Sequence, residues 1–244
     1  MFYLNPAYKD LFDQNGINSG KTLYRFCNEG QLLYEGSIST VWRHRLGDCG
    51  IYAKRYRYAT PRWRYLFRKS RGMNELWSYE CFRQFGIPCP EVLAFAELRK
   101  WGRFHHCVIV TNEILNACDL GVIFREKKLE SSLRMVIMEK VGHYVALMHR
   151  ERFYYHDLKL RNILWKEDSG KDEGLYFIDC PRGRKMPWHS YRATMYDLKT
   201  LYKNSHQICS PAEWQSFLSA YADRSHFSIT KLMVDIDKNH ACAG

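Results

Sequence analysis

The chain has 244 residues, enough for one large domain or two small lobes, and its 46% hydrophobic and 15% aromatic residues can form a sizeable core. A formal net charge of +11 favours an anionic partner such as a nucleotide, a nucleic acid, an acidic glycolipid or a membrane surface. No run of eighteen apolar residues is present, and the first residues lack a basic stretch followed by an apolar one, so we expect neither a membrane-spanning helix nor a secretory signal.

The first part of the chain predicts short strands, in residues 21–58. Thr22–Phe26 alternates weakly and is assigned as a strand. The strongest signal is a hairpin, in which 41–46 and 51–56 flank the turn Gly47-Asp48-Cys49-Gly50. A helix is expected over 74–85, followed by strands at 92–98 and 104–113.

From Ser131 the pattern becomes mostly helical. The expected elements are a long amphipathic helix ending near 149, a loop at 154–162, strands at 162–165 and 175–178 joined by the polar turn 168–172, and helices at 191–206 and 211–223. We therefore predict an α+β fold with a β-rich N-terminal lobe (1–115) and a helical C-terminal lobe (116–244), joined near 113–120. A cleft between two such lobes would bind a nucleotide.

The loop at 155–162 carries the clearest chemical signal. Asp157 and Asn162 stand five residues apart, as in the catalytic loop of protein kinases, and Asp179 follows the next pair of strands. Phosphoryl transfer needs a carboxylate beside the attacking hydroxyl and oxygen ligands for magnesium. We assign Asp157 as the catalytic base, Asn162 and Asp179 as metal ligands, and Lys159 as a group that reaches the transferring phosphoryl. The alternative is a turn-forming acid and amide.

Lys54 ends the alternating strand Ile51-Tyr52-Ala53-Lys54, which is similar to the V-A-I-K strand of kinases. A lysine there pairs with the α- and β-phosphates of ATP and with a carboxylate on a helix, for which Glu75 and Glu80 are the candidates. Since the two acids are five residues apart and do not share a helix face well, only one of them can face Lys54. The alternative is a solvated lysine in a basic run.

Two further segments are less specific. Gly36-Ser37-Ile38-Ser39-Thr40-Val41 lies where a glycine-rich phosphate loop is expected, so Gly36 and Ser37 are candidate phosphate-binding residues; an ordinary hairpin turn is the alternative. Residues 54–71 interleave cations with aromatic rings, which suits nucleic-acid bases or an anionic bilayer. The alternative is a solvated basic face with its rings packed into the lobe.

Other charged groups follow the metal strand. Arg182, Arg184 and Lys185 come soon after Asp179 and could meet an acidic acceptor, or form a solvated loop. Asp197, on the expected helix 191–206, either accepts backbone N–H groups of the catalytic loop, as in kinase-like folds, or is an exposed helix acid.

These residues together resemble the Kdo/WaaP lipopolysaccharide kinases, small protein-kinase-like enzymes of Gram-negative bacteria. The resemblance covers roughly 20–206. It is carried by the following motifs: Ala53-Lys54-Arg55-Tyr56, Glu75 eleven residues before Gly86-Ile87-Pro88-Cys89-Pro90, Thr111-Asn112-Glu113 at the expected hinge, Leu147-Met148-His149, the loop 155–164, Phe177-Ile178-Asp179 and Asp197-Leu198. The spacing from Glu75 to Gly86 favours Glu75 over Glu80, and the hinge position makes Glu113 a candidate nucleotide-binding residue.

The resemblance implies ATP- and Mg²⁺-dependent phosphorylation of a sugar hydroxyl, Kdo or heptose, in the lipopolysaccharide inner core. It implies a cytoplasmic protein, peripheral on the inner face of the inner membrane, with segment 54–71 facing anionic lipid and nucleic acid disfavoured as a partner. Two departures stand out. His156 directly precedes Asp157, where kinases have H-R-D, and no long activation segment follows Asp179. Control by activation-loop phosphorylation and a protein substrate are therefore disfavoured. The alternatives are another small-molecule or RNA-linked kinase of this fold, or a kinase-like binding protein without catalysis.

Overall fold

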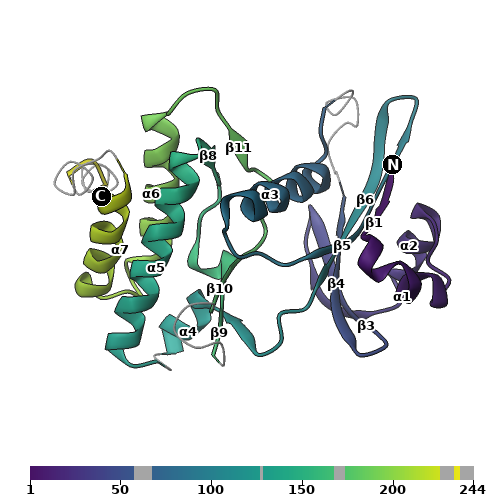
Figure 1. The fold of residues 1–244 in the computed structure, drawn as a ribbon, viewed down its shortest axis with the longest axis horizontal. Helices are drawn as coiled ribbons and strands as arrows, with labels where there is room; N and C mark the ends of the chain where they lie inside the picture. Colours follow the sequence, from purple (N-terminus) through teal and green to yellow (C-terminus); the bar gives the residue numbers. More distant parts are fainter. Residues whose placement is uncertain (58–67, 127–128, 168–173, 226–233, 237–244) are drawn as a thin grey trace. The chain divides into compact units, whose positions relative to one another are not determined.

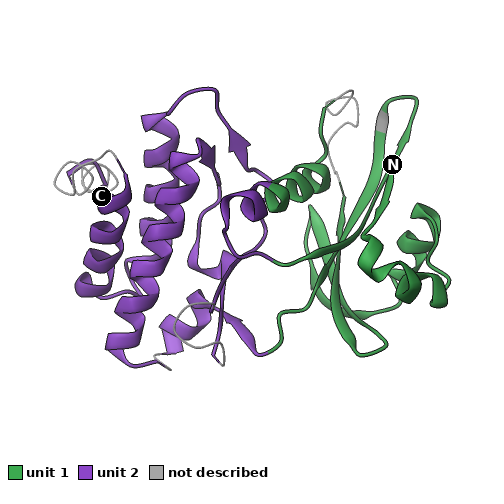
Figure 2. Ribbon diagram, in the orientation of Figure 1, with its two compact units in different colours: residues 1–80, 90–115 green, residues 81–89, 116–244 purple. Residues whose placement is uncertain are grey.

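The structure, a computed structural model, describes residues 1–57, 68–126, 129–167, 174–225 and 234–236. The chain divides into two compact units (Figure 2). Unit 1 contains Met1–Glu80 and Pro90–Leu115, and unit 2 contains Cys81–Cys89 and Asn116–Gly244. Among the described residues, no helix combines the length and the apolar character needed to cross a membrane.

Unit 1 is built on a six-stranded antiparallel sheet in the order β1-β5-β6-β4-β3-β2 (Figure 1). The strands are β1 (Phe2–Leu4), β2 (Gln31–Glu35), β3 (Ser39–Leu46), β4 (Cys49–Tyr56), β5 (Val92–Lys100) and β6 (Arg103–Asn112). The predicted hairpin is confirmed: β3 and β4 pair from Leu46↔Cys49 to Ser39↔Tyr56. Gly47 lies in its turn at φ +56°, a conformation that favours glycine. The strands expected at 92–98 and 104–113 are confirmed as β5 and β6.

The prediction of a strand at Thr22–Phe26 is wrong. These residues belong to α2 (Gly20–Phe26), which follows a 3-10 turn (Pro6–Tyr8) and α1 (Lys9–Gln14). Ser19 caps α2: its Oγ accepts the Thr22 N–H at 3.3 Å, and the Thr22 hydroxyl accepts the Ser19 N–H at 3.0 Å. This reciprocal cap outweighs a weak five-residue alternation, which cannot distinguish a strand from a short helix.

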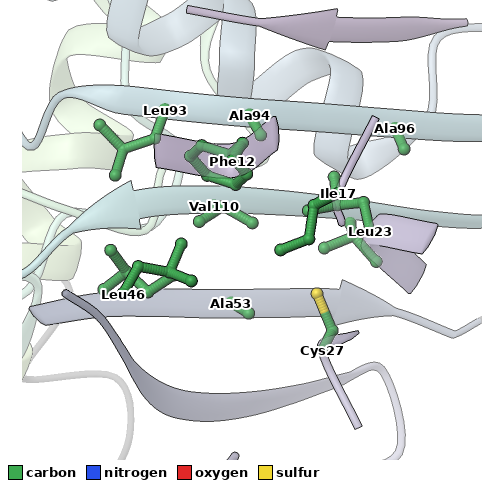
Figure 3. Packing of buried hydrophobic residues seen from close by; sticks show 12 residues of the cluster. Phe12, Ile17, Leu23, Cys27, Leu46, Ala53, Leu93, Ala94, Ala96 and Val110 are labelled. Carbon is green, nitrogen blue, oxygen red and sulfur yellow. The ribbon is translucent and has the colours of Figure 1, made fainter. Parts of the chain in front are cut away.

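The helices α1 and α2 supply one side of the core of unit 1. Phe12, Ile17 and Leu23 lie over the sheet, against small and branched residues such as Ala53 and Val110 (Figure 3). The predicted helix at 74–85 is confirmed as α3 (Arg71–Phe85), whose residues up to Glu80 belong to unit 1. This core fixes β4, the strand that carries Lys54.

Unit 2 is mainly helical, with α4 (Leu120–Glu126), α5 (Ser131–Arg150), α6 (Tyr191–Ser205) and α7 (Pro211–Arg224) (Figure 1). The predicted helices are confirmed as α5, α6 and α7, whereas α4 has no counterpart among the predicted elements. Gly142 of α5 lies against α7, since a Cβ added there would meet the Phe217 carbonyl at 2.5 Å. Short strands complete the unit: β7 (Ala117–Asp119), β8 (Phe153–Tyr154), β9 (Ile163–Lys166), β10 (Leu175–Phe177) and β11 (Arg184–Lys185). β9 and β10 confirm the predicted strand pair; the turn expected at 168–172 lies outside the described residues.

Candidate active site

In unit 2, the loop that follows β8 is hydrogen-bonded to the carboxylate of Asp197, a residue of α6. Its two oxygens accept the backbone N–H groups of Tyr155 and His156, both at 2.7 Å. The kinase-like role considered for Asp197 is therefore confirmed, and the exposed-helix alternative is wrong because the side chain is fully buried. Two charge-assisted hydrogen bonds to consecutive amides fix the backbone immediately before Asp157.

A buried polar chain extends behind Asp197. His149 Nε2, on α5, lies 3.3 Å from the Asp197 carboxylate, and His149 Nδ1 lies 2.9 Å from the Tyr221 hydroxyl, on α7. Burial raises the pKa of Tyr221 far above its usual range, so its hydroxyl stays protonated. Sequence reasoning missed both residues in this role, since nothing local in the sequence links positions 149, 197 and 221.

Asp157 and Asn162 are joined across the loop by a hydrogen bond from the Asn162 Nδ2 to the Asp157 carbonyl, at 2.9 Å. Asn162 is buried and ends a single 3-10 turn, Leu160–Asn162. The Lys159 ammonium lies 2.5 Å from the Asp157 carboxylate, and both side chains remain partly exposed. The loop thus presents a carboxylate, a cation and an amide oxygen within one short segment.

Asp179 is carried next to this loop by the β9–β10 hairpin. The Ile178 N–H donates to the Asn162 carbonyl at 3.0 Å, and the Tyr155 hydroxyl donates to the Ile178 carbonyl. Asp179 adopts a positive φ of +59°, uncommon for a residue other than glycine and frequent at functional sites. The structure therefore brings Asp157, Lys159, Asn162 and Asp179 together within unit 2, while their chemical roles stay predictions.

His156 also adopts a positive φ, +60°. Its ring lies near those of Tyr154 and Tyr196, and its Nε2 is buried without a hydrogen-bond partner among the described residues. Burial lowers the pKa of His156, with the nearby Arg184 and Arg182 acting in the same direction and Asp197 opposing them. The imidazole beside the candidate base is therefore neutral at physiological pH.

In unit 1, Lys54 forms an ion pair with Glu75 of α3, with 3.1 Å between the ammonium and the carboxylate. Of the two acids considered, Glu75 is the one that pairs with Lys54. Its carboxylate is 2% exposed and also accepts the hydroxyls of Tyr56 and Tyr79, the latter at 3.1 Å. A buried carboxylate with three donors is fully satisfied, so the lysine is held in a fixed position.

The other candidates of unit 1 lie in loops of the sheet. Gly36 and Ser37 form the β2–β3 turn, closed by a hydrogen bond from the Gly36 N–H to the Ser39 carbonyl at 2.9 Å. The Glu113 carboxylate is bound by Arg43 at 2.8 Å and by the Tyr52 hydroxyl at 3.2 Å, and the Glu113 N–H donates to the Gly50 carbonyl. The carboxylate and the N–H of Glu113 thus both have partners within unit 1.

The basic segments are described only in part. Of segment 54–71, residues 58–67 lie outside the described part of the chain. Arg182, Arg184 and Lys185 are exposed in unit 2, and the Lys185 ammonium lies 5.1 Å from the centre of the Phe85 ring.

The sequence model of the lipopolysaccharide kinase (Kdo/WaaP) family matches residues 43–221, which is most of the chain. The chain belongs to this family. Two 3-deoxy-D-manno-octulosonic acid kinases of Vibrio vulnificus are similar to it: that of strain YJ016 is 30% identical over 118 residues, and that of strain CMCP6 is 29% identical over 117 residues. These matches span 47% and 48% of this chain and about half of each relative, 46% in both cases.

A solved structure of WaaP in complex with acyl carrier protein has the same fold. It matches with a TM-score of 0.74 over 98% of this chain and 97% of that one, at 20% sequence identity. The α+β, protein-kinase-like fold predicted from the sequence is thus confirmed.

Proposed function

We propose that this chain is an ATP-dependent kinase that phosphorylates a sugar hydroxyl, of Kdo or heptose, in the lipopolysaccharide inner core. The observation that carries the proposal is the assembly of Asp157, Lys159, Asn162 and Asp179 on one anchored loop and one strand end, in a chain of this family. Because the matched kinases are covered over only about half their length, the activity is our inference.

Asp157 would accept the proton of the attacking sugar hydroxyl. Its carboxylate is 29% exposed and hence accessible to an acceptor, and its backbone is fixed by the amides of the two preceding residues. Lys159, in contact with this carboxylate, would stabilise the charge of the transferring phosphoryl group.

Asn162 and Asp179 would hold Mg²⁺. The Asn162 amide nitrogen is used by the Asp157 carbonyl, so its Oδ1 is the atom that remains for a cation. Among the described residues there is no group of three or more His, Cys, Asp and Glu side chains that could hold a metal by itself. Two protein oxygens with substrate phosphates and water are the usual environment of Mg²⁺ in kinases, so the residues present fit the ion. The ion would neutralise charge on the β- and γ-phosphates.

The nucleotide would be bound by residues of unit 1. Lys54, held by Glu75, would pair with the α- and β-phosphates, and the amides of the turn at Gly36 and Ser37 would cover the phosphates. The carbonyl of Glu113 would face the adenine, since its other polar groups are occupied.

The acceptor would be a glycolipid of a Gram-negative bacterium, reached at the cytoplasmic face of the inner membrane by a peripherally bound enzyme. The net charge of +11 and segment 54–71 support contact with an anionic lipid surface. Since the solved relative is in complex with acyl carrier protein, a carrier protein is also a candidate partner, which can be tested by adding purified acyl carrier protein to the assay.

The decisive experiment compares lipopolysaccharide core from cells with and without the gene by mass spectrometry, and complements the deletion with Asp157→Asn. We expect one phosphate to disappear in the deletion and to stay absent with the variant. Asp48→Asn, which changes a fully exposed acid in the β3–β4 turn, is the matched control and should restore the phosphate. An unchanged core in the deletion strain, or full restoration by Asp157→Asn, would refute the proposal.

A further inference from the structure

The tip of the β5–β6 hairpin in unit 1 exposes a tryptophan in an unusual conformation. Lys100 pairs with Arg103, which leaves Trp101 and Gly102 as a two-residue loop, and both have positive φ, +54° and +71°. This is the type I′ geometry, whose first position favours Asn, Asp or Gly. Trp101 is nevertheless there, with 89% of its surface exposed. Trp101 therefore gains no packing in the folded chain and strains its backbone. Its presence at this position indicates a role other than stabilising the fold.

Other apolar side chains are exposed beside this tip. Leu98, on the same hairpin, is 50% exposed, and Phe2 is 37% exposed on β1, where it pairs with Ala96, two residues from Leu98. Strand β1 is antiparallel to β5, so its first residue, Phe2, is the one nearest the hairpin end (Figure 1). The apolar residues therefore form a projecting edge. Such an edge is suited to partial insertion into a lipid surface and not to enclosing a ligand.

Several cations lie on this hairpin and on the segment that contacts it. The Arg99 guanidinium donates to the Arg68 carbonyl at 2.6 Å, which places the segment 68–71 beside the hairpin. Neither 98–103 nor 68–71 contains an acid, and together they contain six Lys and Arg. Lys100, Arg68 and Lys69 are exposed. The acid next to the hairpin in sequence, Glu97, is buried and ion-paired with Arg99, so it offsets that one cation and leaves the others.

We propose that this hairpin tip, with Trp101 and Leu98 at headgroup depth and Lys100, Arg68 and Lys69 around them, is the element that docks the protein on an anionic bilayer. Tryptophan is the residue that favours the membrane–water interface most clearly, and cations beside it bind acidic lipid headgroups. The inference rests on the membrane contact proposed above and makes it specific, but it does not depend on phosphoryl transfer. Segment 54–71 would take part through its last residues, which contact the hairpin.

The test measures binding of the full chain to vesicles of phosphatidylcholine mixed with phosphatidylglycerol, with pure phosphatidylcholine vesicles as reference. The key variant is Trp101→Asn, because it gives the turn the Asn-Gly pair that type I′ prefers, so a loss of binding could not be attributed to misfolding. We expect its thermal midpoint to equal or exceed that of the wild type, and its partition coefficient to fall by about tenfold or more. Trp188→Asn, which removes another highly exposed tryptophan from unit 2, is the matched control and should bind as the wild type does.

The charge component is tested separately. Lys69→Glu combined with Lys100→Glu should lower binding to the anionic vesicles by about tenfold or more, and added salt should weaken wild-type binding. Asp157→Asn should bind vesicles normally, so loss of catalysis and loss of docking are distinguishable. Three outcomes would overturn the proposal: wild-type protein that does not bind the vesicles, equal binding by Trp101→Asn, or equal loss in Trp188→Asn. A concentration-dependent dimer that Trp101→Asn abolishes, without vesicle binding, would assign the tip to self-association instead.

Discussion

Replacement of Asp197 by Asn would test whether the candidate base depends on a buried anchor. The change keeps the shape of the side chain but leaves one oxygen to accept, where the carboxylate accepts the amides of Tyr155 and His156 at 2.7 Å. One of the two buried N–H groups then faces an NH₂ donor, at a cost of about 1–3 kcal/mol. The other keeps a neutral hydrogen bond, about 1 kcal/mol weaker than the charged one.

The free energy of unfolding should therefore fall by roughly 2–4 kcal/mol, a large part of the 5–15 kcal/mol typical of a domain. Urea titrations followed by circular dichroism would measure it. The loop should also lose its fixed position, and a displacement of about 1 Å at a reacting group can reduce kcat about a hundredfold. The KM for ATP should change less than kcat, since Lys54 and the turn at Gly36 and Ser37, which are assigned to the phosphates, belong to unit 1.

The matched control is Asp223→Asn, which changes an exposed acid at the end of α7 and should leave stability and kcat unaltered. Tyr221→Phe provides a milder probe of the same chain of hydrogen bonds, because it removes only the hydroxyl next to His149. If Asp197→Asn unfolded at the wild-type urea concentration and kept its kcat, the two hydrogen bonds to the loop would not anchor it, and the reasoning would be refuted.

Three further predictions concern single side chains. Glu75→Gln should raise the KM for ATP about tenfold or more by releasing Lys54 from its ion pair, whereas Glu80→Gln, on the exposed side of the same helix, should have a much smaller effect in the same steady-state assay. Burial depresses the pKa of His156, so the imidazole of the unfolded chain is protonated at a higher pH than that of the folded chain. The free energy of unfolding should therefore fall as the pH drops from about 7 through about 6.5. In urea titrations across this range, the free energy of unfolding should depend less on pH in His156→Asn, since asparagine tolerates the positive φ. Gly142→Ala should destabilise the protein by about 1–3 kcal/mol in thermal unfolding, because the new methyl group would lie 2.5 Å from the Phe217 carbonyl; an unchanged midpoint would contradict this packing.

The sequence is most informative where chemistry fixes short-range spacing. Asp157 and Asn162 belong to one loop, and the β9–β10 hairpin that brings Asp179 to it is also local, so their proximity follows from the pattern of strands. Lys54 and Glu75 lie 21 residues apart, and the structure pairs them as the motif spacing suggests. Such motifs can be predicted from the sequence because each residue lies at a defined point of a strand or helix.

Features that depend on tertiary contacts cannot be predicted from local sequence patterns in this way. His149 and Tyr221 are 72 residues apart and meet only because α5 packs against α7, so no local pattern reveals their hydrogen bond. Helix α2 is mistaken for a strand because a short alternation hides the capping role of Ser19. The exposure of Trp101 cannot be inferred either, since a tryptophan between two predicted strands is normally assigned to the core.

The segment after Asp179 explains how a kinase-like loop can be ordered without a long activation segment. Strand β11 pairs with β8, so Arg184 lies opposite Tyr154, immediately before the candidate catalytic loop. The Met186 N–H donates to the Arg152 carbonyl at 2.9 Å, and the Arg152 guanidinium donates to the Pro187 carbonyl. These contacts are made by the backbone and by the side chain of one arginine. The short segment after Asp179 is thus tied by its own hydrogen bonds to the strand that precedes the candidate catalytic loop, and the absence of control by phosphorylation stays a prediction.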